Sequence, residues 1–210
     1  MTFSSDSRFH RQLVVVNGTL PALLILVDGW RGKLGANPVE FVTRTTGVLC
    51  LVFLVITLLV TPLRKLFGWN WLLKQRRLLG LYAFFYGVAH LLTYLAYDRG
   101  WQLQTVIGDI YKRPFIAIGM FGFLLMVPLA VTSTNAMIKK LGGKRWNQLH
   151  RLTYLVAIAG VVHYYMIVKS DITYPLFFAI AVGVLLGYRV LAGLKKPVSG
   201  PKRVNSDGVV

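Results

Sequence analysis

The sequence predicts an all-α membrane protein, built as a bundle of six transmembrane helices. Hydrophobic residues make up 55% of its 210 residues, and the mean hydropathy is +0.58, which is too apolar for an ordinary soluble domain. Six apolar stretches follow one another along the chain, and basic residues gather in alternate loops between them. The single cysteine, Cys50, excludes a disulfide framework.

The six apolar stretches have roughly the length of a membrane crossing. They are residues 12–27, 45–61, 79–97, 115–134, 152–168 and 174–192. Several are shorter than the roughly 20 residues that cross hydrocarbon, but aromatic or aliphatic flanks extend each of them. The first follows basic residues, as a signal peptide would, yet Asp28-Gly29-Trp30 stands where a small-residue cleavage pattern would be. We therefore expect a retained helix there.

The basic residues predict the orientation of the bundle. Seventeen of the 24 Lys and Arg residues lie near the two termini or in the loops at 62–78 and 135–151. Such residues stay cytoplasmic, so both termini are expected inside. The expected organisation is a cytoplasmic N-terminus (1–11), a six-helix transmembrane domain (12–192) and a cytoplasmic basic tail (193–210). The net charge of +17 then reflects topology and contact with anionic lipid, not nucleic-acid binding.

Two histidines, His90 and His163, stand inside apolar stretches at matching depth. His90 lies thirteen residues after Arg77, and His163 lies twelve after Arg151. Both are thus about 18–20 Å beyond a basic anchor, on helices that run in the same direction. An ionisable side chain at that depth needs a partner, and two imidazoles suit the two axial positions of a haem used for electron transfer. Alternatively, each ring bonds a backbone carbonyl or a hydroxyl and only joins helices.

A third histidine, His150, stands at the cytoplasmic start of the fifth stretch. Thirteen residues separate it from His163, which is about 20 Å along a helix and enough to separate two stacked haems. The same spacing turns the helix by about 220°, so a bend is needed for both rings to face one channel. Otherwise His150 is a loop histidine near lipid headgroups.

Tyrosines beside the paired histidines are candidate hydrogen-bond donors to the other nitrogen of each ring, the one that would not bind iron. Tyr94 lies one turn beyond His90, and Tyr164 or Tyr165 lies beside His163. Such partners orient ligands and tune a bound metal.

Four segments of the chain resemble the MsrQ (YedZ) family of haem-binding membrane subunits. They are GKRWNQLHRLTY at 143–154, LAVTSTNA at 129–136, RRLLG at 76–80 leading to His90, and TLLVTPL at 57–63. The resemblance covers about residues 10–192. The wider relatives are ferric reductases and the transmembrane part of NADPH oxidases.

The resemblance implies a b-type cytochrome of the bacterial inner membrane. In this family electrons come from the quinone pool or a cytosolic flavin reductase. They pass outward to MsrP, a periplasmic molybdopterin enzyme that reduces oxidised methionines in exported proteins. The implied cofactors are haem b and FMN, with His90 and His163 as outer haem ligands and His150 as the inner one. The chain would be the electron-transfer subunit rather than the catalytic one.

The third stretch departs from the two-haem relatives. They carry two histidines there, whereas this chain has Arg76 and Arg77 at the inner position. One haem is therefore expected, and a second remains open. The sequence also lacks a Gly-rich dinucleotide fingerprint, so we expect a separate electron donor to dock on the basic loops at 62–78 and 135–151.

Three other functions compete with this interpretation. A stand-alone ferric or quinone reductase would use the same haem with a different acceptor. A transporter with histidine proton relays is disfavoured because the apolar stretches contain no Asp or Glu. A scaffold without chemistry leaves the matching depth of His90 and His163 unexplained.

Overall fold

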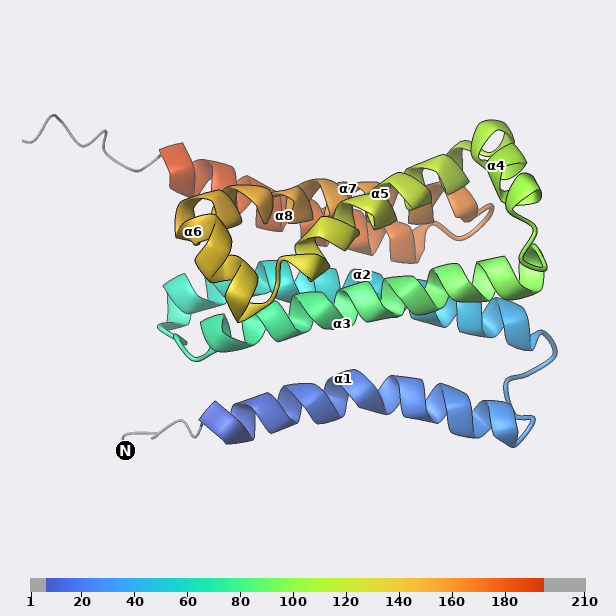
Figure 1. Cartoon of the computed structure of the whole chain (residues 1–210), viewed down its shortest axis with the longest axis horizontal. Helices are drawn as coiled ribbons and strands as arrows, with labels where there is room; N and C mark the ends of the chain where they lie inside the picture. Colours follow the sequence, from blue (N-terminus) through green and yellow to red (C-terminus); the bar gives the residue numbers. More distant parts are fainter. Residues whose placement is uncertain (1–6, 195–210) are drawn as a thin grey trace, which may run out of the picture.

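The computed structural model describes residues 7–194, and all regular structure within that range is helical (Figure 1). The helices are α1 (Ser7–Trp30), α2 (Pro38–Phe67), α3 (Leu72–Thr93), the π-helical turn η1 (Tyr94–Asp98), α4 (Leu103–Lys112), α5 (Pro114–Val131), α6 (Asn135–Leu149), α7 (Leu152–Ile167) and α8 (Thr173–Leu194). The predicted all-α class is confirmed. Residues 195–210 of the predicted basic tail, and residues 1–6 of the predicted N-terminal segment, lie outside the described residues.

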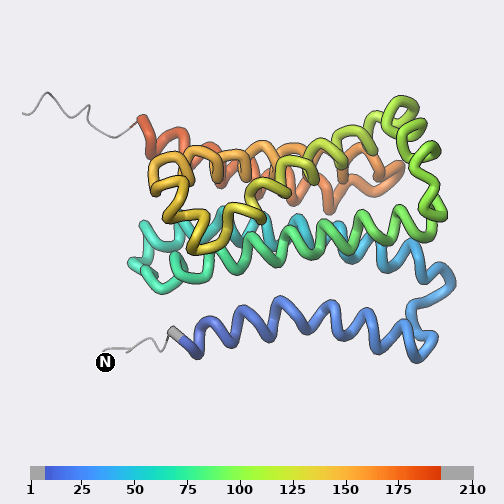
Figure 2. Tube along the Cα trace, viewed as in Figure 1, coloured from blue at the N-terminus to red at the C-terminus, as the bar shows by residue number. Residues whose placement is uncertain are grey.

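Five of the described helices are long and apolar enough to cross a membrane, so the chain is a multi-pass membrane protein. They are α1, α2, α3 continued by η1, α5 and α8. The sixth predicted crossing is α7, which is apolar but has only 16 residues, or about 24 Å of helix. Figure 2 shows the described chain starting and ending at the same end of the bundle, as an even number of crossings requires.

Two helices occupy segments where the sequence analysis expected loops. α4 lies at the end of the bundle opposite the described chain ends, and α6 lies at the same end as them (Figure 1). Both helices are too short and too polar to cross a membrane. Thr134 caps the start of α6, its hydroxyl accepting from the Met137 amide, and the helix bends at Gly142, which has a φ of 73°.

α2 is the central helix. It packs against α3, α7 and α8, while α5 packs against α7. The start of α2 is fixed by Asn37, whose side chain accepts from the Glu40 amide, and by Pro38, which occupies the first turn. It ends at Gly68, which adopts a left-handed φ of 70°.

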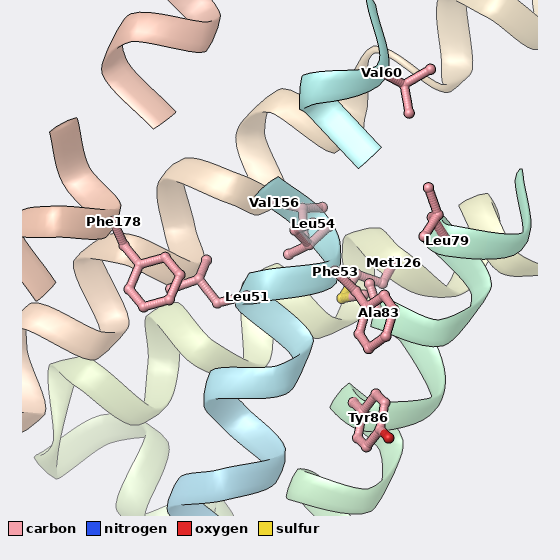
Figure 3. Close-up of a cluster of buried hydrophobic side chains, with 10 residues drawn as sticks. All are labelled: Leu51, Phe53, Leu54, Val60, Leu79, Ala83, Tyr86, Met126, Val156 and Phe178. Carbon is pink, nitrogen blue, oxygen red and sulfur yellow. The ribbon is translucent and has the colours of Figure 1, made fainter. Parts of the chain in front are cut away.

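The core lies where these helices meet (Figure 3). Leu51 and Leu54 of α2 are buried against Ala83 of α3, Met126 of α5 and Val156 of α7. The outward faces of the helices remain apolar, which suits contact with lipid. α3 and α7, the two helices that carry the paired histidines, both pack against α2 and α5.

Arg189 is a charged residue inside the apolar helix α8. Its guanidinium donates to the Leu58 carbonyl of α2 and to the Leu185 carbonyl one turn earlier on α8. Leu58 needs this donor because Pro62, four residues later, has no N–H to complete the helical bond. Arg189 therefore joins α8 to α2 at the point where a proline interrupts the ladder.

α1 confirms the helix expected from the first apolar stretch, the one with the weakest pattern. It packs mainly on α3. The Tyr86 hydroxyl donates to the Gly18 carbonyl at 2.6 Å, and the hydroxyls of Thr19 and Tyr82 lie 2.9 Å apart. Gly18 is needed there because a Cβ would lie 2.6 Å from the Tyr82 ring.

Candidate functional site

The structure brings the rings of His90 and His163 next to each other. His90 lies one turn before the end of α3, and His163 lies in the last third of α7. Their ring centroids are 6.0 Å apart, and the ring planes are nearly perpendicular, at 87°. The matching depth read from the sequence therefore corresponds to a real pair of imidazoles.

Each ring is fixed through its Nδ1 atom to a backbone carbonyl. His90 Nδ1 lies 2.8 Å from the Thr43 oxygen on α2, and His163 Nδ1 lies 2.7 Å from the Phe115 oxygen on α5. A carbonyl only accepts, so Nδ1 carries the proton on both rings. The Nε2 atoms keep their lone pairs, which is the form in which imidazole binds a metal.

The bonds to these carbonyls bear on both interpretations of the histidines, the purely structural one and the metal-binding one. A bond to a backbone carbonyl is what a purely structural histidine would make. Here, however, it occupies only one nitrogen of each ring, and the same bond orients a metal ligand and raises its basicity. The bonds to Thr43 and Phe115 are therefore compatible with a structural role and with metal binding alike.

Tyr94, one of the tyrosines predicted as donors to the rings, binds elsewhere. The Tyr94 hydroxyl donates to Asp109 Oδ2 of α4 at 2.6 Å, so the expectation for Tyr94 is wrong. Tyr164 packs edge-on against Phe178 of α8, with ring centroids 6.1 Å apart. The carbonyls take the place that the sequence assigned to tyrosine. No side-chain pattern predicts them, because every residue has a carbonyl.

Asp109 joins α4 to the segment that follows α3 through Tyr94 and Arg99, and it also pairs with Arg113 at the end of α4 itself. Arg99 Nε lies 2.5 Å from Asp109 Oδ2, and Arg113 Nε lies 3.5 Å from Oδ1. The hydrogen bond from Tyr94 lowers the pKa of the Asp109 carboxyl below its ordinary value of 3.8, and the charges of both arginines lower it further. This ionised cluster lies one turn beyond His90, at the end of the bundle where α4 lies.

His150 lies apart from the other two histidines, between α6 and α7. Its Nε2 lies 3.1 Å from the Thr132 hydroxyl, and its ring stacks on Trp146 with centroids 3.8 Å apart. Thr132 gives its own proton to the Pro128 carbonyl at 2.6 Å, so His150 Nε2 donates and Nδ1 holds the lone pair. Burial, and then the nearby charge of Arg76, lower the pKa of His150 to about 4, which keeps the ring neutral at physiological pH.

Arg76 and Arg77, the arginines at the inner position of the third stretch, lie near His150 and the start of α6. Arg76 lies near enough to act on His150 electrostatically, and Arg77 Nη1 donates to Asn135 Oδ1 at 2.5 Å. Among the described residues, no three His, Cys, Asp or Glu side chains gather as a metal cluster. The candidate site is thus the pair His90 and His163.

Comparison with known proteins identifies the family. Residues 46–161 match the family model described as the ferric reductase like transmembrane component. The chain is 52% identical to the "Protein-methionine-sulfoxide reductase heme-binding subunit MsrQ" of Azospira oryzae over 87% of this chain and 78% of that one. It is 51% identical to the MsrQ protein of Ralstonia nicotianae, over 81% of this chain and 80% of the relative. The MsrQ protein of Rhodospirillum rubrum is 48% identical over 92% of this chain and 93% of its own. The chain therefore belongs to the MsrQ family, within the ferric reductase-like transmembrane proteins.

Proposed function

We propose that the chain is a haem-binding membrane subunit that carries electrons to a periplasmic methionine-sulfoxide reductase. The observation that carries the proposal is the pair of neighbouring imidazoles, with centroids 6.0 Å apart and both Nδ1 atoms occupied by carbonyls. The relatives support it because they are named as heme-binding subunits of methionine-sulfoxide reductase.

The spacing of the rings fits one metal ion between them. A bond from metal to imidazole nitrogen is about 2 Å long, and each ring nitrogen lies about 1 Å from its ring centre, so two axial imidazoles would have centroids about 6 Å apart. The iron of a haem b bound there would supply a one-electron couple with no free position for dioxygen. His90 and His163 would hold the iron through Nε2, and the carbonyl partners of Nδ1 would keep that nitrogen basic. The surrounding helices are apolar, and in a bilayer they would keep water from the site.

His150 has a different place in the proposal. To ligate a second haem, it must either leave the Thr132 hydroxyl or bind through Nδ1, because its Nε2 is already a donor. We therefore assign one haem to His90 and His163 and keep His150 as the ligand position for a second, inner haem. FMN is expected only from the resemblance, and no described residue is assigned to it.

The partners follow from the topology that we propose. The chain crosses the bacterial inner membrane six times with both termini in the cytoplasm. Electrons enter from the quinone pool or a cytosolic flavin reductase and leave to an MsrP-like periplasmic molybdopterin enzyme. A stand-alone ferric or quinone reductase is the second candidate, because the matching family model describes a ferric reductase component.

Haem retention tests the site. Protein purified from haem-replete cells is expected to be red, with a Soret band that sharpens and shifts on reduction with dithionite. His90→Ala and His163→Ala should each abolish haem retention, while His150→Ala should lower it only in part. His10→Ala, on the peripheral helix α1, is the matched control and should retain haem fully. Full retention in either of the first two variants would refute the ligand assignment.

Oxidation kinetics test the acceptor. The reduced protein should be reoxidised faster in the presence of an MsrP-like reductase and methionine sulfoxide than with either one alone. Equal rates, with fast reoxidation by ferric chelates instead, would favour the stand-alone ferric reductase.

A further inference from the structure

A carbonyl and a glycine, one turn apart on α2, meet the ring of His90. The Thr43 carbonyl takes the Nδ1 proton at 2.8 Å. A Cβ added to Gly47 would lie 3.0 Å from Nδ1 and 3.1 Å from Cε1 of the same ring, closer than ordinary van der Waals contact. In an α-helix the amide of residue 47 also bonds the carbonyl of residue 43. The Thr43 oxygen therefore accepts from both residues, and the imidazole lies against the bare backbone of Gly47.

α5 repeats this arrangement for His163. The Phe115 carbonyl takes the Nδ1 proton at 2.7 Å, and Gly119 follows it by four residues. A Cβ on Gly119 would lie 2.6 Å from Cε1 and 2.7 Å from Nδ1 of the His163 ring, distances that side chains do not tolerate without a shift. The helix pairs α2 with α3 and α5 with α7 thus hold their histidines by the same two contacts at the same spacing.

Gly18 of α1 meets the Tyr82 ring in a similar way, but not every glycine of the bundle lies against a side chain. A Cβ on Gly80 of α3, or on Gly183 of α8, would meet nothing within 4 Å. Glycine is therefore not needed at every close crossing of these helices. At the two histidine positions its missing side chain is what admits the ring.

We infer that Gly47 and Gly119 are positioning residues that hold the two imidazole planes nearly perpendicular before any cofactor binds. Rotation of either ring about its Cβ–Cγ bond would break the bond to the Thr43 or Phe115 carbonyl or move ring atoms into the neighbouring helix. The angle of 87° between the rings is therefore set by the protein. This inference rests on the proposed function, in which a haem iron lies between the rings.

The ring angle has a spectroscopic consequence that is separate from activity. When two axial imidazoles are parallel, they split the iron d orbitals of π symmetry, and the low-spin ferric ion gives three resolved EPR features. When the planes are perpendicular, those orbitals stay nearly degenerate. The spectrum then shows one strongly anisotropic feature at low field. We expect the second pattern for the wild-type ferric protein, and a resolved three-feature spectrum would overturn the inference.

Glycine variants test whether Gly47 and Gly119 set the angle. Gly119→Ala should move the low-field feature most, because its methyl meets the closest contact, and Gly47→Ala should move it less. Gly80→Ala and Gly183→Ala add the same methyl in open space and should leave the spectrum unchanged. Where Gly119→Ala does not assemble, Gly47→Ala and the wild-type spectrum decide the question.

The outcomes separate this inference from the proposed function. Colourless wild-type protein would refute the haem assignment itself. Red protein whose EPR spectrum is identical in wild type, Gly47→Ala and Gly119→Ala would refute only the positioning role of the glycines. A spectral shift confined to these two variants, with the controls unchanged, supports it.

Discussion

At the scale of single residues, proline and arginine compensate for each other across two helices. Pro62 removes an amide that the Leu58 carbonyl would otherwise accept from, and Arg189 supplies a donor from α8. A carbonyl left unpaired in an apolar bundle is costly because no water replaces the lost partner. Arg189 thus explains why a charge is kept within an apolar helix.

The compensation predicts non-additive stability. Arg189→Met should destabilise the protein by about 1–3 kcal/mol, because it leaves the Leu58 carbonyl unpaired. In a Pro62→Ala background the restored amide serves that carbonyl, so the same substitution should cost less. A double-mutant cycle on thermal unfolding in detergent measures the difference, expected at roughly 0.5 kcal/mol or more. Additive effects would show that Arg189 does not replace the missing amide.

At the scale of elements, an ionised carboxylate contributes to the attachment of α4 to the bundle. The Asp109 carboxylate accepts a hydrogen bond from the Tyr94 hydroxyl and forms ion pairs with Arg99 and Arg113. The first of these partners lies on η1, the turn that continues the helix of His90. The ionised carboxylate therefore joins the surface helix to the end of a membrane-spanning one.

Replacing that carboxylate should loosen α4. Asp109→Asn leaves two guanidinium groups without their counter-charge and should destabilise the protein by about 1–3 kcal/mol, with faster hydrogen exchange across α4. Gln104→Asn, on the exposed part of the same helix, is the control and should change neither. Unchanged exchange in Asp109→Asn would mean that apolar contacts alone hold α4.

The depressed pKa of Asp109 gives this difference a pH dependence. The carboxylate stabilises the fold fully above its ordinary pKa of 3.8, and the contribution is lost as pH falls through the lower pKa of the folded state. The stability gap between wild type and Asp109→Asn should therefore be constant from neutral pH to about pH 4 and shrink below it. Thermal unfolding over this range measures the gap, and a gap that grows on acidification would contradict the assignment.

At the scale of the whole molecule, the two ends of the bundle differ in how many basic residues the sequence predicts there and in which short helix each carries. The described chain starts and ends at the end that carries α6, and α4 lies at the other end (Figure 1). The proposed orientation puts the α6 end in the cytoplasm and the paired histidines nearer the periplasm. An electron entering from the cytoplasm would then cross most of the bundle before it leaves.

Site-directed labelling checks this orientation. In a Cys50→Ser background, Gln104→Cys on α4 should react with a membrane-impermeant maleimide in intact cells freed of their outer membrane. Lys140→Cys on α6 should react only after the inner membrane is opened. Both side chains are exposed in the structure, so the labelling pattern reports sidedness. The reverse pattern would invert the topology.

The sequence predicted the features that depend on hydrophobicity and charge, and it missed those that depend on backbone contacts. Apolar length predicted the long helices such as α2 and α5, and equal depth predicted that His90 would meet His163. Apolar length is silent on α4 and α6, which are stabilised by caps and ion pairs. The partners of the rings were out of reach because they are the carbonyls of Thr43 and Phe115. Gly47 and Gly119 gave a weak signal, since glycine is common in membrane helices.

The fixed positions of the two imidazoles affect how fast an electron could pass through the site. A redox centre exchanges electrons quickly when its ligands keep their positions in both oxidation states, because little nuclear rearrangement accompanies the transfer. His90 and His163 are each anchored to a helix backbone at 2.8 and 2.7 Å, independent of whatever lies between them. With iron bound there, reduction would alter the charge at the centre while the cage around it stays still, which suits a relay better than a chemical catalyst.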